Sequence, residues 1–548
     1  MKFYEACAAA FRRENIDTCF ALLGDANMHW AGALAEQGAN FIYTRHEHAA
    51  VAAAASHARA TGNIGCATVT CGPGVTQLMT ILPIAVRAQI PVIVFAGEAP
   101  LLKAWYNQKI DQAPFVEACG ARYHALHDTA AMIDDIHAAI AEAKRDRTVV
   151  VIGVPFDLQQ QHYEGALDQP LSDARATPPA PLPPQARQIE EAVRWIDEAQ
   201  RPVIMAGLGA VSSDAHDACL HLAEKAGALV ATTLPAKGYF HHQDYSLGMA
   251  GGFATEKAKD IFQQADLVIG IGARLASHAF NGGKLTPDAR VIHLDIDPQE
   301  MVQGRKAADL LISSDAKLGA DALASSVTPK TGWRTPEMRQ KTNDALNLPD
   351  DHATPDGLLH PMAVIKTLSE ITPPDCHIIN TSGHSAYYAA HMNQHPQSHF
   401  TVIRDFGAIG NGTSFALGIA AAHPLRPIIL IDGDGSALMH IQELETMKRH
   451  NLKILTIIMN DGAYGSEVHK LRADNVTLAG SVFGRPDFAG IGRGFGMEGT
   501  VFASPDDMPK MMATKLADFL RQDGPQIWDI HISDEIASPQ ILAAHKSH

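Results

Sequence analysis

Two acidic turns late in the chain combine the residue types and the spacing that can hold a divalent cation. The first turn is Gly-Asp-Gly-Ser at positions 433–436, which follows an apolar run at 427–431. The second is Asn-Asp-Gly-Ala at positions 460–463, after an apolar run that ends at Met459. If both runs are buried strands of one parallel sheet, the two turns lie at the same edge of that sheet. Asp434 and Asp461 then converge on one hard cation such as Mg²⁺, with a backbone carbonyl and ligand oxygens completing an octahedron.

Each motif has a simpler interpretation when it is taken alone, because Gly-Asp-Gly-Ser and Asn-Asp-Gly are both common turn formers. The pair is more specific, because each motif follows an apolar run and one helix-length segment separates them. We therefore interpret the two turns together as one cation site at the edge of a parallel sheet.

The length and composition of the chain indicate a globular protein of several domains. Its 548 residues exceed what one hydrophobic core holds, so roughly two to four domains are expected. The formal net charge of −16 argues against nucleic acid or an anionic membrane as the main partner. The seven cysteines form no Cys-x-x-Cys motif, so the sequence indicates neither a zinc site nor a disulfide framework.

The sequence gives no indication of export or of membrane insertion. The N-terminal residues 1–17 have the charge pattern of an amphipathic helix rather than of a signal peptide. No apolar run approaches the roughly 20 residues that a membrane-spanning helix needs. We therefore expect a cytoplasmic protein.

Short apolar runs alternate with helix-length segments in three successive blocks, which predicts an α/β protein with three consecutive doubly wound parallel-sheet domains. We expect these domains over residues 1–165, 188–325 and 359–548. The proline-rich stretch 166–187 and the polar stretch 326–358 are the expected linkers. The expected strands are 18–23, 40–43, 66–70, 91–96, 149–153, 202–206, 229–233, 267–271, 291–295, 377–380, 400–403, 427–431, 454–459 and 527–532.

A single glutamate near the N-terminus also has a context that suggests chemistry. Glu47 lies in Arg-His-Glu-His-Ala-Ala and begins an alanine-rich helix that ends near Thr61. The expected strand 40–43 feeds directly into this helix, so we expect its start to be buried. A buried carboxylate needs a hydrogen-bond partner. The alternative is an acid that is favoured at a helix start only by the helix dipole.

The motif around Glu47, the Cys-Gly-Pro-Gly turn at 71–74 with the segment that follows it, and the paired acidic turns resemble a known group of enzymes. This group is the thiamine-diphosphate-dependent acetolactate synthase and 2-oxoacid decarboxylase superfamily. The resemblance covers nearly the whole chain. It implies a pyrimidine-binding domain, a central domain and a diphosphate-binding domain, in that order.

The resemblance implies that Glu47 hydrogen-bonds N1′ of the aminopyrimidine ring of thiamine diphosphate. A carboxyl that shares a proton there drives the 4′-amino group toward its imino form, which removes the proton from C2 of the thiazolium ring. The cofactor then acts as the electron sink. Burial that raises the pKa of Glu47 above its ordinary value of about 4.3 favours this proton sharing.

The third domain supplies the other residues that the resemblance assigns to the cofactor. Spacing from Asp434 places Asp461 in the metal-ligand position, where many relatives have asparagine, and leaves Asn460 as the alternative. The resemblance implies Mg²⁺ with Asp434, Asp461 and the Ala463 carbonyl as its ligands. The implied cofactor-binding residues are Gly383, His384, Ser385, Gly407, Ile409, Asp434, Gly435, Ser436, Asp461, Ala463 and Tyr464.

Few residues indicate which reaction the protein catalyses. The segment 104–110 lacks the paired histidines of pyruvate decarboxylases, and Gln108 resembles the glutamine of acetolactate synthases and carboligating lyases. We therefore expect C–C bond formation or cleavage in 2-oxoacids or 2-hydroxyketones. The alternatives are a non-oxidative 2-oxoacid decarboxylase and a non-catalytic paralogue that binds the cofactor. Glu467 is the candidate proton donor, or else part of a solvated helix face. For His48, we expect a packed or solvated histidine rather than one that faces the site.

The resemblance also bears on assembly and on a second cofactor. Glu47 and the metal ligands of one chain belong to different active sites in this group, which implies a homodimer or homotetramer with its sites at the subunit interface. FAD in the central domain is possible but not favoured. The Gly-Leu-Gly at 207–209 in that domain is either a dinucleotide-binding loop or a structural turn.

Overall fold

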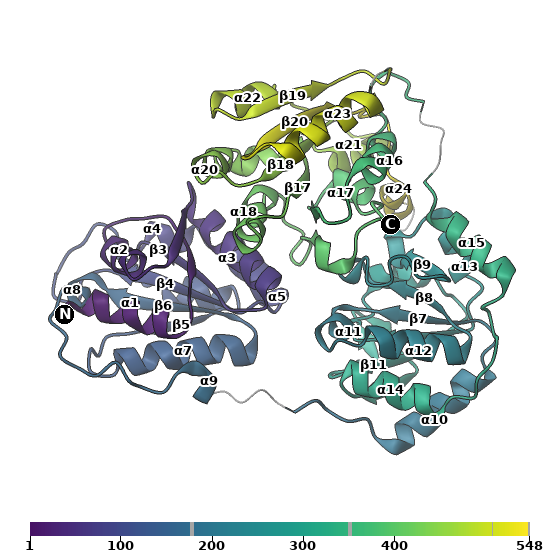
Figure 1. The fold of residues 1–548 in the computed structure, drawn as a ribbon, viewed down its shortest axis with the longest axis horizontal. Helices are drawn as coiled ribbons and strands as arrows, with labels where there is room; N and C mark the ends of the chain where they lie inside the picture. The colour runs from purple at the N-terminus through teal and green to yellow at the C-terminus, as the bar shows by residue number, and fades with distance from the viewer. Residues whose placement is uncertain (176–179, 349–352, 507, 546–548) are drawn as a thin grey trace.

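Three six-stranded parallel sheets organise the chain in the computed structural model, which describes residues 1–175, 180–348, 353–506 and 508–545. Figure 1 shows them as three α/β domains: an N-terminal one in purple and blue, a central one in teal, and a C-terminal one in green and yellow. This arrangement confirms the predicted fold class.

The first sheet has the order β2-β1-β3-β4-β6-β5, so β1 has β2 on one side and β3 on the other. Most of its strands are apolar, and every residue of β6 is buried, whereas no residue of the edge strand β5 is. The elements are α1 (Phe3–Arg13), β1 (Thr18–Ala21), α2 (Met28–Glu36), β2 (Asn40–Tyr43), α3 (Glu47–Thr61), β3 (Gly65–Val69), α4 (Pro73–Thr76), α5 (Ile81–Arg87), β4 (Val92–Glu98), α6 (Ala113–Ala118), β5 (Arg122–Ala125), α7 (Met132–Asp146), β6 (Val149–Pro155), α8 (Phe156–Gln159) and α9 (Ser172–Arg175).

The central sheet has the order β14-β11-β10-β7-β8-β9. A short antiparallel hairpin, β12-β13, lies outside it. The elements are α10 (Ala186–Glu198), β7 (Pro202–Ala206), α11 (Leu208–Ser212), α12 (His216–Ala226), β8 (Leu229–Thr232), β9 (Ser246–Met249), α13 (Glu256–Phe262), β10 (Leu267–Ile271), β11 (Arg290–Asp295), β12 (Met301–Val302), β13 (Arg305–Lys306), β14 (Leu310–Ser313), α14 (Ala316–Ser326) and α15 (Pro336–Leu346).

The third sheet has the order β16-β15-β17-β18-β20-β19, which places β17 and β18 side by side at its centre. The elements are α16 (Pro361–Ile371), β15 (His377–Asn380), α17 (His384–Ala389), β16 (Phe400–Val402), α18 (Gly412–Ala422), β17 (Ile428–Gly433), α19 (Asp434–Ala437), α20 (Glu443–Arg449), β18 (Ile454–Asn460), α21 (Gly465–Ala473), α22 (Phe488–Gly494), β19 (Glu498–Phe502), α23 (Met508–Arg521), β20 (Gln526–His531) and α24 (Pro539–His545).

The expected linkers contain some regular structure. Part of each linker, residues 176–179 and 349–352, lies outside the described residues. The first expected linker contains the short helix α9, and the second contains α15. Met338 and Ala345 of α15 are buried in the core of the central domain, so this part of the stretch belongs to that domain.

The Gly-Leu-Gly of the central domain allows close packing between neighbouring backbone segments. A Cβ atom at Gly207 would lie 2.3 Å from the carbonyl oxygen of Gly272, and one at Gly209 would lie 2.7 Å from the Gly272 Cα. No side chain fits in this space. The contact supports the structural alternative for this motif.

The N-terminal and C-terminal domains meet through α3 and α18, which lie against each other in Figure 1. The alanines of α3 permit this approach, because a Cβ atom at Gly418 would lie only 2.0 Å from the Ala53 carbonyl oxygen. Ser56 Oγ donates a hydrogen bond to the Phe415 carbonyl oxygen at 2.9 Å across the same contact. Side chains of both domains form one hydrophobic core there.

Candidate functional site

Asp434 and Asp461 lie together at the carboxyl ends of the neighbouring strands β17 and β18. The backbone N–H groups of Gly462 and Ala463 donate to Asp434 Oδ2 at 2.7 and 3.2 Å. The Ala463 N–H also lies 3.3 Å from Asp461 Oδ1. The two carboxylates that the sequence predicted to converge are therefore neighbours.

Burial makes this carboxylate pair costly in its charged form. Asp434 is 2% exposed and Asp461 is 7% exposed. Burial raises the pKa of both carboxyl groups, and the negative charge of Asp461 raises that of Asp434 further. A divalent cation would remove this repulsion, so the donor set suits a hard, oxygen-seeking ion.

Asn460 points away from the carboxylate pair. Its Nδ2 donates to Asp529 Oδ1 at 2.9 Å and to the Pro486 carbonyl oxygen at 3.2 Å. Asp529 lies on β20, the strand that pairs with β18 on the side opposite β17. The amide nitrogen of Asn460 therefore has structural partners, whereas its Oδ1 is buried without a hydrogen-bond partner among the described residues.

The start of α17 presents two buried polar atoms to the same region. His384 Nδ1 and Ser385 Oγ are buried without a hydrogen-bond partner among the described residues. His384 Nδ1 lies 3.7 Å from Asp461 Oδ2. His384 Nε2 accepts a hydrogen bond from the Ser538 backbone N–H at 3.2 Å, so neutral His384 carries its proton on Nδ1. Both side chains can therefore donate to an anion next to the carboxylate pair.

The loop between β16 and α18 carries Ile409. Gly407 and Gly410 both adopt positive φ angles, of 74° and 89°, which set the backbone on either side of this residue. Ile409 is half-buried and approaches Gly383, whose Cβ position would lie 3.9 Å from the Ile409 side chain. Ser436 Oγ accepts a hydrogen bond from the Gly410 N–H at 2.8 Å. This bond ties the Ile409 loop to the first acidic turn.

Tyr464 covers Gly435 in the first acidic turn. A Cβ atom at Gly435 would lie 2.6 Å from the Tyr464 ring, so only glycine fits there. The other side of Tyr464 packs edge-on against the Phe483 ring, with the ring centroids 5.2 Å apart. The Phe483 N–H donates to the Gly462 carbonyl oxygen at 2.9 Å. The segment around Phe483 thus lies over the second acidic turn.

Glu47 begins α3 and is half-buried, whereas the sequence predicted full burial of the helix start. Burial raises the pKa of its carboxyl group, in the direction that proton sharing requires. The neighbouring His48 is buried and bonds to Asn411 at the end of the Ile409 loop, so it is packed as expected. Glu47 is therefore part of a helix start that touches this loop within one chain.

Gln108 lies against the Gly-Pro-Gly turn after β3. Its Oε1 accepts from Cys71 Sγ at 3.4 Å, and a Cβ atom at Gly72 would lie 2.2 Å from the Gln108 carbonyl oxygen. The buried Gln112 fixes this contact, because its Oε1 accepts from the Gly72 N–H at 2.7 Å. Sequence analysis missed Gln112. Its position four residues after Gln108 is the only signal that could have drawn attention to it.

Glu467 lies on the exposed face of α21. Its side chain is 55% exposed and forms an ion pair with Lys470 at 3.4 Å. This is the arrangement of a solvated helix face within a single chain. His469, two residues further on, is buried and its ring centroid lies 4.8 Å from that of His384.

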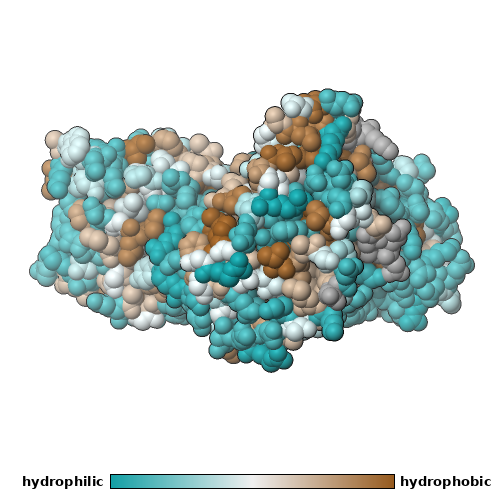
Figure 2. Space-filling model, turned by 90° about the horizontal axis from the view of Figure 1, so that it is seen from above, coloured by the Kyte–Doolittle hydropathy of each residue, from teal (hydrophilic) through white to brown (hydrophobic). Residues whose placement is uncertain are grey.

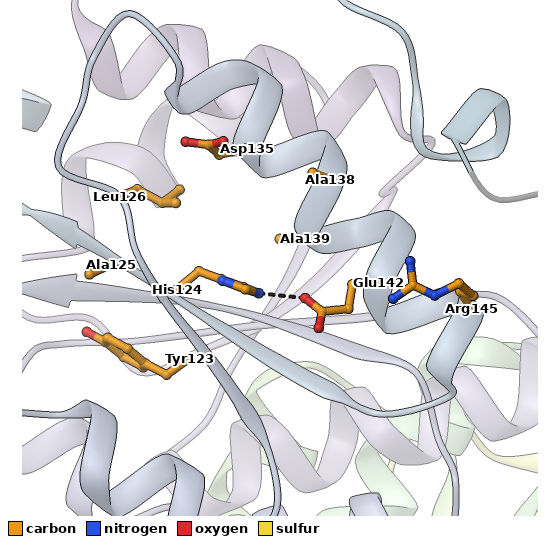
Figure 3. A pocket seen from close by; sticks show the side chains of 9 residues that line it. All are labelled: Tyr123, His124, Ala125, Leu126, Asp135, Ala138, Ala139, Glu142 and Arg145. Carbon is orange, nitrogen blue, oxygen red and sulfur yellow. Dashed lines mark hydrogen bonds and ion pairs between the residues drawn. The ribbon is translucent and has the colours of Figure 1, made fainter.

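Two cavities lie elsewhere in the molecule. One of about 520 Å³ lies between β5 and α7, where His124 Nε2 faces Glu142 Oε2 (Figure 3). The other, of about 330 Å³, lies beside the buried Lys237 of the central domain. Neither is lined by a residue that the sequence assigned to the cofactor.

The carboxylate pair offers a cation few side-chain ligands. Within the described ranges, no group of three or more His, Cys, Asp and Glu side chains is arranged to hold a metal ion. A cation between Asp434 and Asp461 would take its remaining ligands from backbone carbonyls, water and a bound phosphate group, as Mg²⁺ usually does. The orphaned polar atoms of His384 and Ser385 fit such a phosphate group.

None of the helices in the described part of the chain is long and apolar enough to cross a membrane. All seven cysteines are free thiols, and six of them are buried.

Comparison with known proteins matches all three domains. Residues 1–115 match the thiamine pyrophosphate enzyme, N-terminal TPP binding domain; residues 189–323 match the central domain; and residues 381–530 match the C-terminal TPP binding domain. Thiamine pyrophosphate is another name for thiamine diphosphate. The three matched segments each contain most of one of the parallel sheets.

Individual relatives agree with the family match. The chain is 30% identical to acetolactate synthase 1, chloroplastic, of Nicotiana tabacum over 84% of this chain and 70% of that protein. It is 29% identical to the acetolactate synthase large subunit of Parasynechococcus marenigrum (strain WH8102) over 95% and 86%, respectively. It is 28% identical to the acetolactate synthase isozyme 2 large subunit of Escherichia coli (strain K12) over 96% and 94%. The chain belongs to the thiamine pyrophosphate enzyme family.

Proposed function

We propose that the protein is a thiamine-diphosphate- and Mg²⁺-dependent carboligase or lyase that makes or breaks a C–C bond next to a carbonyl group. The observation that carries this proposal is the buried pair Asp434 and Asp461 beside the unpartnered donors of His384 and Ser385. Family membership and the acetolactate synthase relatives support the same activity.

The residues of the third domain would hold the diphosphate end of the cofactor. Asp434, Asp461 and the Ala463 carbonyl would bind Mg²⁺, and His384 and Ser385 would donate to phosphate oxygens. Ile409 would support the ring end of the cofactor, because its side chain projects from a loop that lies next to Gly383. When bound, the cofactor supplies a nucleophilic carbon and an electron sink.

Glu47 would hold a proton at the pyrimidine ring. Its raised pKa keeps the carboxyl group partly protonated nearer to neutral pH than an ordinary glutamate. Gln108 and the Gly-Pro-Gly turn would face the substrate, since both follow strands of the first sheet at their carboxyl ends. We propose a 2-oxoacid or a 2-hydroxyketone as the substrate, on the resemblance of Gln108 to the glutamine of carboligating enzymes.

We propose that two subunits complete each active site. Large apolar side chains are exposed in the loop after β4, where Leu102 is 83% and Trp105 77% exposed. Met439 and Phe483 are exposed beside the acidic turns of the third domain. Figure 2 shows apolar patches between hydrophilic ones on the face seen from above. Apolar side chains are thus exposed in both the first and the third domain. A second copy of the chain would bury them in a homodimer or homotetramer.

Two further parts of the proposal have simple tests. We propose that the central domain binds no flavin, and a visible absorption band of bound flavin in the purified protein would contradict this.

We also propose a cytoplasmic location, which the seven free thiols suit. Detection of the protein in cell fractions tests the location.

Product analysis with 2-oxoacids tests the proposed reaction. The purified protein is incubated with thiamine diphosphate, Mg²⁺ and a panel of 2-oxoacids, with and without an aldehyde acceptor. Formation of a 2-hydroxyketone or 2-hydroxy-2-oxoalkyl acid supports carboligation. Release of free aldehyde alone would instead identify a non-oxidative decarboxylase, and cofactor binding without turnover of any substrate would identify a non-catalytic relative.

A further inference from the structure

The two histidines that flank Glu47 each have a defined partner. His46 caps α3, because its Nδ1 accepts a hydrogen bond from the His48 N–H at 3.1 Å. His48 Nε2 lies 2.7 Å from Asn411 Oδ1, and this hydrogen bond joins the first domain to the third. His48 is 5% exposed and Asn411 is 2% exposed, so water does not compete for the bond.

The direction of this bond follows from the other contacts of Asn411. Its Nδ2 lies 3.1 Å from the Ala408 carbonyl oxygen and 3.4 Å from that of Ile409. Carbonyl oxygens only accept, so Nδ2 donates to them and Oδ1 is left to accept from His48. Burial lowers the pKa of His48 to about 3, so the ring is neutral and donates from Nε2–H.

Residues of the third domain also hold the same loop. His440 Nδ1 donates to the Gly410 carbonyl oxygen at 2.8 Å, and the Gly410 N–H donates to Ser436 Oγ at 2.8 Å. The rings of His440 and His48 pack with their centroids 4.7 Å apart. Residues 408–411 are therefore held between the two domains.

This loop needs external support to keep one conformation. Gly407 and Gly410 have positive φ angles of 74° and 89°, and glycine leaves such backbone free to move to other conformations. Ile409 lies between them and is only half-buried. Its position therefore depends on the hydrogen bonds that Asn411 and Gly410 make, more than on packing of its own side chain.

We propose that His48 is a positioning residue that holds the Ile409 loop in its cofactor-binding conformation through Asn411. The inference rests on the proposed function, because Ile409 matters only if the loop supports the ring end of thiamine diphosphate. It gives His48 a role distinct from that of Glu47: His48 contacts neither cofactor nor substrate and acts on the loop.

Amide hydrogen exchange in the protein free of metal and cofactor directly tests the hydrogen bond between His48 and Asn411, which we call the bridge. His48→Ala removes the donor and leaves Asn411 Oδ1 buried and unpaired, so exchange in the peptide covering residues 404–411 should rise roughly tenfold. His48→Gln should restore slow exchange, because a glutamine amide can donate in place of Nε2–H. Ser56→Ala is the matched control: it removes a hydrogen bond from the same α3–α18 contact, away from the loop.

The result that would overturn the bridge is unchanged exchange in His48→Ala, or an equal rise in Ser56→Ala. If His48→Ala does not fold, His48→Leu serves instead. That variant fills more of the space of the imidazole ring but offers no donor to Asn411 Oδ1, and it should loosen the same peptide.

Calorimetric titration with thiamine diphosphate and Mg²⁺ links the bridge to the site. His48→Ala should bind the cofactor roughly tenfold more weakly and have a lower kcat at saturating cofactor, and His48→Gln should recover most of both. Loosened exchange with unchanged cofactor affinity would refute the positioning role. If the unaltered protein binds no thiamine diphosphate, the proposed function fails, whereas the exchange experiment still decides whether His48 holds the loop.

Discussion

Asp434 and Asp461 share one backbone amide: the Ala463 N–H lies 3.2 Å from Asp434 Oδ2 and 3.3 Å from Asp461 Oδ1. The turn after β18 therefore fixes both carboxylates at once. The same turn contains the Ala463 carbonyl, which we propose as a third metal ligand. One short segment thus contacts all three of the protein ligands that we propose for the cation.

Replacement of Asp461 should separate metal binding from folding. In Asp461→Ala, we expect Mg²⁺ affinity in the presence of thiamine diphosphate to fall by more than about 100-fold, since even residues beyond the direct ligands of a metal contribute roughly 10–100-fold. Isothermal titration with Mg²⁺ measures this loss.

Asn460→Ala is the matched comparison at the adjacent position. Asn460 bonds to Asp529 and not to the carboxylate pair, so its loss should lower the free energy of unfolding by about 1–3 kcal/mol. Its Mg²⁺ affinity should stay close to that of the unaltered protein. If Asn460→Ala loses Mg²⁺ binding and Asp461→Ala keeps it, the ligand assignment is wrong.

The carboxylate pair should make the stability of the metal-free protein depend on pH. Both pKa values are higher in the folded protein than in the unfolded chain, so the folded state binds more protons. Its stability from this source is therefore fully present near pH 4 and is lost as pH rises through and above neutrality. Thermal unfolding of the metal-free protein at several pH values measures the trend, and Asp434→Asn should flatten it.

Mg²⁺ affinity should change with pH in the opposite direction. The ion must displace protons from the carboxylate pair, so its affinity rises as pH increases toward slightly alkaline values. Mg²⁺ should thus protect the protein from unfolding most strongly at the pH values at which the metal-free protein is least stable. Equal protection at low and high pH would contradict the raised pKa values.

Glu47→Gln should abolish turnover while the cofactor still binds. The amide cannot share a proton with the pyrimidine ring, so kcat should fall by about 100-fold or more, as expected when a proton-transfer residue is lost. Calorimetric titration with thiamine diphosphate provides the control for cofactor binding. Full turnover by Glu47→Gln would refute the role given to this residue.

The exposed apolar loop after β4 should be part of a subunit interface. We expect the unaltered protein to sediment as a dimer or tetramer, and Leu102→Asp combined with Trp105→Asp to shift it toward monomer and to reduce activity. Leu425, which is 94% exposed in the turn before β17, provides the control substitution Leu425→Asp. An active monomer in sedimentation velocity would contradict the shared active site.

The sequence predicted the central strands, and it missed the hairpin strands β12 and β13 and the edge strands β5, β9, β14 and β19. The edge strands β2 and β16 were predicted, so position at an edge is only part of the reason. An edge strand is covered on fewer sides, so it need not be a continuous apolar run, as β5 and β19 illustrate. Three of the five residues in β19 are at least partly exposed on the surface, and none of the four in β5 is buried.

The candidate site was predictable where motif and strand end coincide, as for Asp434 and Asp461. Contacts between domains were not, because nothing in the local sequence shows that His48 faces Asn411, 363 positions away. The half-burial of Glu47 was missed for the same reason, since burial of a helix start depends on which domain covers it. The role of Glu467 remains a prediction, and its side chain is exposed and paired with Lys470.

The products formed from 2-oxoacids test the proposed activity most directly. Purified protein with thiamine diphosphate and Mg²⁺ is supplied with pyruvate and other 2-oxoacids, with and without an aldehyde, and the products are identified by NMR. Our account predicts a new C–C bond in the product, dependent on both additions and lost in Glu47→Gln and Asp461→Ala. Free aldehyde as the sole product, or turnover without thiamine diphosphate, would contradict it.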